Sequence, residues 1–327
     1  MNLSPFTSHL SPLIGLSPMD DITDLPFRQV CKEMGADLLI TEFIASEALN
    51  RDAEKSFRKM RFTPEQRPIG IQIFGADEEE LLRCLDVVEQ AEPDFIDINW
   101  GCPVRKVAGR GAGSGILQDI PKMLKITTSM VKHAHLPVTV KTRLGYNTDS
   151  MMITDFAEAL QDTGIAALSI HGRTKTQMYS GTADWTMIGE VKNNPRIHIP
   201  IFGNGDITTA AQAVEAQRRY GVDGILIGRG AIGNPWIFEQ CQRAFRGEAE
   251  REISVRERVE VCRRHLLAAA EFKGDRTAVF EMRKHYGAYF KGLFNFKPFR
   301  LALVATPSIE ETLAVLDRIE EHYQTEK

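Results

Sequence analysis

Hydrophobic and polar positions follow two alternating patterns along the first three quarters of the chain. Short runs rich in Val, Ile and Leu, typical of buried strands, are followed by segments with amphipathic helical spacing, such as Glu78–Ala91, Asp155–Asp162 and Thr208–Tyr220. The pattern predicts eight strands, at Leu13–Ser17, Asp37–Phe43, Ile69–Phe74, Phe95–Asn99, Val138–Arg143, Ala167–His171, Ile199–Gly203 and Gly224–Ile227.

Eight strand–helix units over roughly 240 residues predict an α/β fold, a (β/α)8 TIM barrel, over residues 1–247. An open, doubly wound sheet is the alternative. After residue 247 the strand pattern stops, and Val255–Lys273, Arg276–Leu293 and Ile309–Tyr323 have the spacing of amphipathic helices. We therefore expect a small, all-helical C-terminal domain over residues 248–327.

Polar or conformationally special residues end most of the predicted strands. A barrel gathers these ends at one mouth, and burying so many polar groups is costly unless they bind something. The pattern therefore predicts one shared ligand site, formed by Pro18, Met19, Asp20, Gln72, Asn99, Cys102, Lys141, Arg143, His171, Arg173, Asn204, Gly205, Asp206, Gly228 and Arg229.

The glycine-rich turns after the last two predicted strands suggest a phosphate site, since loop amides and a helix N-terminus hold anions there in barrels. Residues Gly228–Gly233 also match Gly-x-Gly-x-x-Gly. No further strand follows to carry an acidic ribose ligand, so a mononucleotide phosphate fits better than a dinucleotide fold. The alternative is that these glycines only make tight turns.

Lys141, His171 and Gln72 indicate what else the ligand contains. A lysine at the barrel centre stabilises the negative charge that a reduced flavin develops, and an amide hydrogen-bonds the ring edge. Together with the phosphate turns, these three residues suggest that the ligand is FMN. A sugar phosphate is the alternative ligand.

Cys102 follows a strand that breaks at Gly101 and Pro103, so its thiol lies where the ligand is expected. The next residues, 104–113, are basic and rich in glycine, which suggests a flexible loop that closes over an anionic substrate. We expect Cys102 to act as a proton donor or nucleophile; the alternative is a buried structural cysteine.

Composition and charge exclude several classes of protein. The net charge is −4, the five cysteines are scattered without metal-ligand spacing, and no apolar run approaches a membrane span. The first twelve residues lack the features of a signal peptide. We therefore expect a cytoplasmic protein without metal or membrane, and we expect a monomer.

Several motifs resemble the tRNA-dihydrouridine synthases, most closely the bacterial B type. Pro18–Arg28 resembles the opening motif of the family and Asn99–Val107 its cysteine motif. Trp100 and Ala108, at the substrate loop, depart from the residues expected there. Further matches, in the family's order, are Lys141–Arg143, His171–Thr174, Asn204–Asp206, Gly228–Arg229, Met282–His285, Tyr289 and Lys291–Gly292.

The resemblance implies an oxidoreductase that reduces the 5,6 double bond of specific tRNA uridines, using FMN recharged by NADPH. Cys102 would give the proton to carbon-5. Residues implied to bind FMN are Pro18, Met19, Asp20, Gln72, Lys141, His171, Asn204, Gly205, Asp206, Gly228 and Arg229. Residues expected to contact the uracil or the tRNA are Asn99, Arg143, Arg173, Lys106, Arg283, Lys284 and Lys291.

A basic run interleaved with aromatic residues lies in the predicted helical domain. We expect its aromatic side chains to pack inward and its cations to contact RNA phosphates. The run comprises Arg276, Arg283, Lys284, His285, Lys291, Lys297 and Arg300, with Tyr286, Tyr289, Phe290, Phe294, Phe296 and Phe299.

Two other functions are the alternatives for the whole protein. One is an FMN-dependent oxidoreductase of a small pyrimidine, similar to dihydroorotate dehydrogenases. The other is an RNA-binding module whose barrel is catalytically idle.

Overall fold

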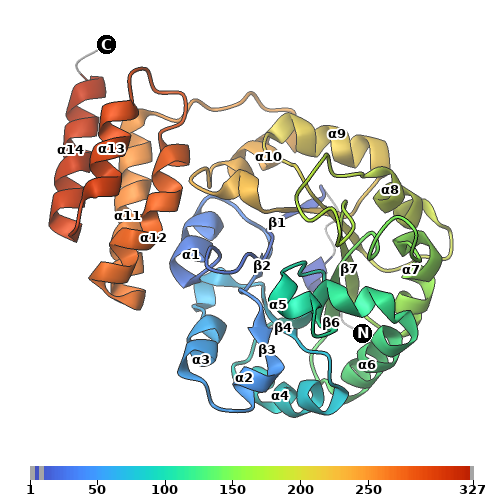
Figure 1. Cartoon of the computed structure of the whole chain (residues 1–327). Helices are drawn as coiled ribbons and strands as arrows, with labels where there is room; N and C mark the ends of the chain where they lie inside the picture. Colours follow the sequence, from blue (N-terminus) through green and yellow to red (C-terminus); the bar gives the residue numbers. More distant parts are fainter. Residues whose placement is uncertain (1–3, 7–10, 325–327) are drawn as a thin grey trace.

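A parallel β-barrel surrounded by helices forms the larger part of the molecule, and a group of helices stands at its side (Figure 1). This computed structural model describes residues 4–6 and 11–324, so the first twelve residues, where no signal peptide is expected, lie partly outside it. The strands are β1 (Leu13–Leu16), β2 (Leu39–Ile40), β3 (Ile44–Ala45), β4 (Ile69–Phe74), β5 (Phe95–Trp100), β6 (Val138–Arg143), β7 (Ala167–His171), β8 (Ile201–Asn204) and β9 (Gly224–Ile227).

The strand order β1-β9-β8-β7-β6-β5-β4-β2, with every pair parallel, confirms the predicted barrel. Closure occurs between β1 and the segment before β2, where Gly15 bridges Leu38. The Leu16 amide donates to Leu38 O at 2.9 Å and the Asp37 amide to Ile14 O at 2.9 Å. The open, doubly wound alternative is therefore wrong.

The second predicted strand, Asp37–Phe43, is wrong in its extent. The structure divides this region into β2 and β3, each only two residues long, and both pair with β4. Between them, the Thr41 amide still donates to Gly70 O of β4 at 2.9 Å, while the Thr41 hydroxyl accepts from the Gln72 amide at 3.0 Å and Glu42 accepts from the Asp21 amide at 2.8 Å.

Helices cover the outer face of the barrel and bury their apolar sides against it. In α4, for example, Asp77 caps the N-terminus by accepting from the Glu80 amide, and Leu81, Cys84, Leu85 and Val88 face the core. The covering helices are α1 (Leu25–Glu33), α2 (Ser46–Leu49), α3 (Glu54–Met60), α4 (Glu78–Gln90), α6 (Ile120–His133), α7 (Ile153–Asp162), α8 (Thr186–Asn193), α9 (Ala210–Tyr220) and α10 (Ile237–Phe245). The short helix α5 (Arg105–Ala108) lies inside this ring of helices, after the end of β5 (Figure 1).

The C-terminal region is all-helical as predicted, but it contains four helices among the described residues rather than three. They are α11 (Val255–Lys273), α12 (Asp275–Tyr289), α13 (Lys297–Ala305) and α14 (Ile309–Gln324). The sequence pattern missed α13, whose first turn carries Pro298, a residue well suited to a helix start. The division into domains at residue 248 stays a prediction; α10 ends at Phe245 and α11 begins at Val255.

An aromatic and histidine cluster joins the C-terminal helices to α1. The ring of Phe27 lies 5.4 Å from that of His265 and 5.1 Å from that of His285. Burial lowers the pKa of His265 to about 4 and the pKa of His285 well below its ordinary value, so both rings are neutral at neutral pH. The expectation that His285 belongs to a cationic RNA-binding run is therefore wrong.

The other aromatic residues of that run pack largely as expected. Tyr286, Tyr289, Phe290 and Phe296 are buried, whereas Phe294 is 76% exposed. No described helix has the length and apolar character needed to cross a membrane.

Gly233, in the segment between β9 and α10, allows the barrel to approach α12 closely. Its φ is +62°, and a Cβ atom there would lie 2.5 Å from His285 O and 2.8 Å from Tyr289 N. The last glycine of the Gly-x-Gly-x-x-Gly match therefore serves packing between barrel and helices.

We predict that Gly233→Ala destabilises the protein more than Gly247→Ala. Both glycines have a positive φ, which costs an alanine about 1–2 kcal/mol, but a Cβ at Gly247 meets open space. The clash at Gly233 adds about 1–3 kcal/mol to the loss in free energy of unfolding. Urea unfolding followed by circular dichroism measures both; equal losses would contradict the packing role of Gly233.

Candidate active site

A cavity of about 760 Å³ opens at the carboxyl ends of the strands. Cys102, Asn99 and Arg143 line it, and Gln72 is the one predicted cofactor residue that does not. Residues at the ends of β1, β6, β7, β8 and β9 complete the wall: Pro18, Met19, Asp20, Lys141, His171, Asn204, Gly205, Asp206, Gly228 and Arg229. The barrel thus brings together most of the predicted site, as expected from parallel strands.

Asn99 and Ser114 fix the backbone of Cys102. The side-chain oxygen of Asn99 accepts from the amides of Gly101 at 3.0 Å and Cys102 at 2.8 Å. Cys102 O accepts from the Ser114 amide at 3.0 Å and from its hydroxyl at 2.8 Å. The thiol therefore projects from a clamped turn, and the residues after it form the short helix α5.

The Cys102 side chain is 6% exposed, and burial raises the pKa of its thiol, although Arg143 and Lys141 act in the opposite direction. The thiol is therefore protonated at neutral pH. A protonated thiol can donate a proton, whereas nucleophilic attack requires the thiolate.

Asn204 links Lys141 and His171 at the centre of the barrel mouth. Its side-chain oxygen accepts from Lys141 Nζ at 3.1 Å and faces His171 Nδ1 at 2.7 Å, and its amide donates to Leu226 O at 2.7 Å. Burial, together with nearby Lys141 and Arg143, lowers the pKa of His171 to about 3. Neutral His171 then carries its proton on Nδ1, where the acceptor lies.

The positive charge of Lys141 is only weakly balanced by the protein. Burial, and next the charge of Arg143, lower the pKa of Lys141 to about 8. No carboxylate among the described residues forms an ion pair with it; Asn204 is its one hydrogen-bond acceptor there. An anionic or electron-rich ligand edge in the cavity would supply the missing partner.

Arg143 and Arg173 hold the segment between β7 and α8. Arg143 donates to Gly101 O at 2.7 Å, Thr174 O at 3.0 Å and Met178 O at 2.9 Å, so it ties this segment to the cysteine turn. Arg173, 1% exposed, donates to Ser180 O at 3.1 Å and Gly181 O at 2.6 Å and does not line the cavity.

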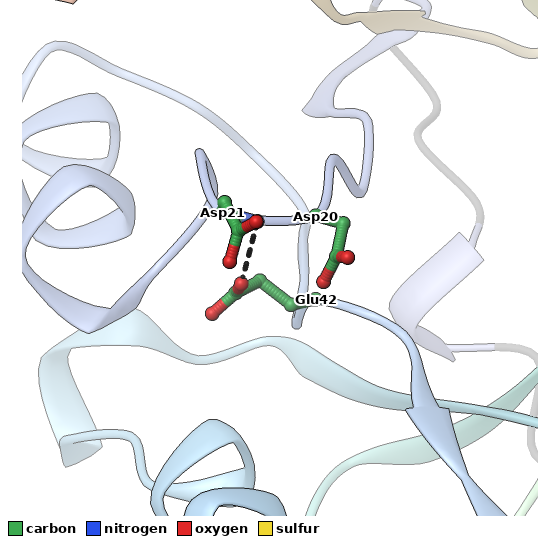
Figure 2. Close-up of side chains that lie close together, drawn as sticks. All are labelled: Asp20, Asp21 and Glu42. Atoms are coloured by element: carbon green, nitrogen blue, oxygen red, sulfur yellow. Dashed lines mark hydrogen bonds between the residues drawn. The ribbon is translucent and has the colours of Figure 1, made fainter. Parts of the chain in front are cut away.

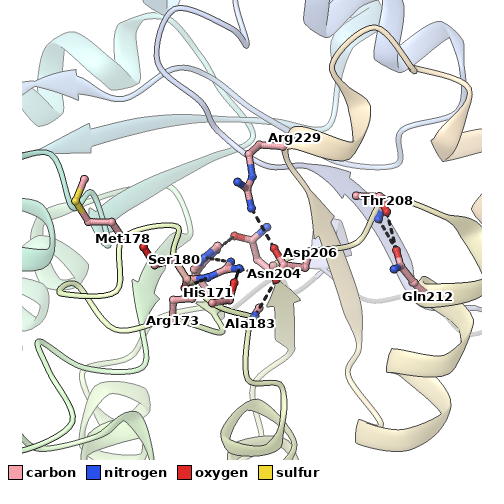
Figure 3. Close-up of polar contacts among 12 residues, drawn as sticks. His171, Arg173, Met178, Ser180, Ala183, Asn204, Asp206, Thr208, Gln212 and Arg229 are labelled. Carbon is pink, nitrogen blue, oxygen red and sulfur yellow. Dashed lines mark hydrogen bonds and ion pairs between the residues drawn. The ribbon is translucent and has the colours of Figure 1, made fainter. Parts of the chain in front are cut away.

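Asp206 organises the predicted phosphate turn (Figure 3). Its carboxylate pairs with Arg173 at 2.6 Å and Arg229 at 3.0 Å, and accepts from the Ala183 amide at 2.8 Å. Burial alone would raise the pKa of Asp206, but these partners outweigh it and the pKa is lowered. Asp206 therefore orients the Arg229 guanidinium at the cavity wall while it stays ionised.

Gln72 lies beneath the cavity in a buried hydrogen-bond chain. It donates to Asp97 Oδ2 at 2.6 Å and accepts from the Asn99 amide at 2.8 Å, while Thr139 donates to Asp97 Oδ1 at 2.5 Å. Burial raises the pKa of Asp97 to about 6. Sequence reasoning missed Asp97, although it lies two positions before Asn99 on the same face of β5.

Sequence reasoning also missed Tyr179 as a residue of the site. Its ring lines the cavity, is 54% exposed, and lies 5.7 Å from the guanidinium of Arg143 and 5.0 Å from that of Arg229. It belongs to a predicted loop, where periodicity gives no signal.

Three acidic side chains, Asp20, Asp21 and Glu42, lie together at the edge of the mouth (Figure 2). The Lys59 ammonium contacts the Asp20 carboxylate and lies 3.4 Å from Glu42. This lysine offsets part of the acidic charge. The expectation of no metal stays a prediction.

The remaining predicted substrate residues lie outside this cavity. Lys106 lines a neighbouring cavity, described below. Arg283 donates to Thr306 O at 3.2 Å and stacks on Phe280 at 4.2 Å, whereas Lys284 contacts Asp21 O across the junction with the barrel. Lys291 is exposed.

Comparisons with known proteins agree with this geometry. The chain is 35% identical over 316 residues to a "Probable tRNA-dihydrouridine synthase" of Rickettsia conorii, covering 96% of this chain and 94% of the relative. It is 35% identical to "tRNA-dihydrouridine synthase B" of Xanthomonas campestris pv. campestris, with the same coverage.

The fold is similar to that of histamine dehydrogenase from Rhizobium sp. 4-9, with a TM-score of 0.53 and 11% identity over 81% of this chain and 51% of that one. The family model described as "Dihydrouridine synthase (Dus)" matches residues 15–326. Taken with these relatives, the match shows that the chain belongs to the dihydrouridine synthase family.

Proposed function

We propose that this protein reduces the 5,6 double bond of specific uridines in tRNA, with bound FMN and with NADPH as the reductant. The observation that carries the proposal is a protonated cysteine and an incompletely paired lysine lining one cavity at the barrel mouth. The names of the relatives supply the substrate, tRNA, and the cytoplasm is part of the proposal.

The residues of the cavity fit FMN. Its volume of about 760 Å³ lies within the usual range of about 300–1,000 Å³ for ligand sites. Gly205, Gly228 and Arg229 would hold the phosphate, and Lys141 would face the electron-rich edge of the ring. Gly228 lines the cavity, and a Cβ there would lie no closer than 3.5 Å to a neighbouring atom, Met19 Sδ, so packing within the protein does not require a glycine at this position.

When bound, FMN supplies hydride transfer from NADPH to carbon-6 of the uracil. Cys102 then gives its thiol proton to carbon-5, so that the double bond becomes a single bond with one hydrogen added at each carbon. Lys141 and Arg143 favour the thiolate that remains, since both act to lower its pKa, and solvent returns the proton.

The other residues position these groups. Asn99 holds the cysteine turn, and Arg143 fastens that turn to the segment that carries Tyr179. Asp206 keeps Arg229 directed toward the phosphate turn. A uracil within folded tRNA must leave its stack to enter such a cavity, and loop bases do so at the lowest cost.

We assign tRNA binding in part to the helical region over residues 248–327. Arg283 and Lys284 also make contacts within the protein, whereas the ammonium of Lys291 forms no hydrogen bond or ion pair with another described residue. Exposed cations of this kind contact phosphates and add salt dependence to binding.

We predict that Cys102→Ala lowers the rate of dihydrouridine formation by about 10²–10⁴-fold, because the general acid is lost. FMN content and the oxidation of NADPH without tRNA remain as in the wild type. Cys241→Ala, a buried cysteine of α10 remote from the cavity wall, serves as the control. Wild-type formation of dihydrouridine by Cys102→Ala, measured by nucleoside mass spectrometry, would refute the role.

We predict that FMN binding weakens as the pH rises above about 8. The charged form of Lys141 is complete well below its pKa of about 8 and is lost above it, so the affinity falls on the alkaline side. Titration of the FMN-free protein with FMN between about pH 7 and pH 9 measures the effect. Lys141→Met binds FMN more weakly and without this break; an identical profile in both proteins would contradict the assignment.

We predict that Lys291→Glu raises the KM for tRNA about threefold to tenfold, since one phosphate contact is lost and a repulsion replaces it. The steps that do not involve tRNA keep their rates. The rate of NADPH oxidation without tRNA serves as the internal control. An unchanged KM at low salt would remove Lys291 from the RNA-binding surface.

A further inference from the structure

A second cavity, of about 700 Å³, lies beside the active-site cavity at the carboxyl ends of β3 and β4. Asp20, Phe43 and Val104 line both cavities, so the two share a wall. Residues of α2, α3 and α5 form much of the remaining wall. None of the steps proposed above uses this space.

The walls of the second cavity suit a flat heterocycle. Phe43 and Phe74 line it with their ring centroids 5.3 Å apart and their planes at 81°. Val104 and Val107 add aliphatic surface from the cysteine turn and α5. Aromatic and aliphatic walls of this kind stack against the faces of nucleobases.

Ser46 supplies a polar group without a partner. Its hydroxyl oxygen is buried and forms no hydrogen bond with any described residue, and the residue, 1% exposed, lines the second cavity. Gly75 lies opposite: a Cβ there would be 2.6 Å from Ser46 Oγ. Buried hydroxyls are nearly always paired, so Ser46 points to a ligand that carries a hydrogen-bonding group.

The acidic residues at this cavity are mostly engaged elsewhere. Asp20 pairs with Lys59, Asp77 caps α4, and Glu80 pairs with Arg83 at 2.6 Å. Among the described acids that line the cavity, Glu47 and Asp77 form no ion pair with a side chain, although Asp77 accepts a backbone amide.

The cations at this cavity are mostly unpaired. Lys55 lies on α3, Lys106 on α5, and Arg110 just after it, and all three are exposed. None of them forms an ion pair with a described residue, whereas the remaining lysine, Lys59, is held by Asp20 and Glu42. Three unpaired cations against two acids without an ion pair, one of which caps α4, favour an anionic ligand.

We infer that this cavity binds the adenosine half of NADPH, with its 2′-phosphate among Lys55, Lys106 and Arg110. The inference rests on the proposed function, in which the nicotinamide ring reaches the flavin in the adjoining cavity. Two riboses and a pyrophosphate separate the rings of a dinucleotide, so one molecule can occupy two adjacent cavities. Two consecutive bases of an RNA are carried by adjacent sugars, so the distance between them is shorter than that between the two rings of the dinucleotide.

Binding of adenosine 2′,5′-bisphosphate to the FMN-loaded full chain tests this directly by isothermal titration calorimetry. We expect the wild type to bind it more tightly than adenosine 5′-monophosphate. The double variant Lys55→Ala/Arg110→Ala weakens binding of the bisphosphate about tenfold and that of the monophosphate far less, because charge-assisted contacts to the 2′-phosphate are lost. Arg51→Ala/Arg105→Ala removes the same charge outside both cavities and leaves the affinity unchanged.

Ala76→Phe provides a second test, since Ala76 lines the cavity and a ring there would occupy part of it. We expect a weaker apparent affinity for NADPH in anaerobic reduction of the bound FMN, and an unchanged reaction of dithionite-reduced enzyme with tRNA. Normal bisphosphate and NADPH binding in both variants would overturn the inference, as would a defect confined to tRNA. Absence of any NADPH oxidation or dihydrouridine formation by the wild type would instead refute the proposed function.

Discussion

The closure of the parallel sheet between β1 and Leu38 is the constraint on which the site depends. Gly15 is required at this seam because a Cβ there would lie 2.8 Å from the Leu226 side chain and 3.0 Å from Leu38 O. Asp37 strengthens the seam, since its carboxylate accepts from the Ile14 amide at 2.8 Å. Once the sheet closes, the carboxyl ends of its strands face one mouth, so that Cys102, which follows β5, and Gly228, which follows β9, line one cavity.

The protonation states at this mouth follow from placing several basic groups in one buried space. Lys141, Arg143 and His171 cannot all be charged there at low cost, so the pKa of His171 falls to about 3 and that of Lys141 to about 8. Burial has the opposite effect on the thiol of Cys102, whose pKa rises. The result is a proton donor beside an available cation, which suits a reaction that adds hydride and a proton to one double bond.

The sequence predicted the barrel and most of the mouth because strand periodicity and residues at strand ends are local signals. It could not predict that Arg143 and Arg173 hold distant carbonyls, or that Asp97 joins Gln72 and Thr139, since these contacts depend on packing between strands. The burial of His285 was missed for the same reason: a basic run gives no sign of which side of α12 faces α1. The division of the second strand accompanies the polar contacts of the residues between β2 and β3.

Clamping of the cysteine turn by Asn99 and Arg143, together with the family relationship, makes reduction of uridine at this mouth the central claim. The most direct measurement incubates the purified, flavin-loaded protein with an unmodified tRNA transcript and NADPH, and compares dihydrouridine formed with NADPH consumed. The account predicts that the two amounts are equal once oxidation measured without tRNA is subtracted. Oxidation of NADPH without any dihydrouridine in the transcript would contradict it.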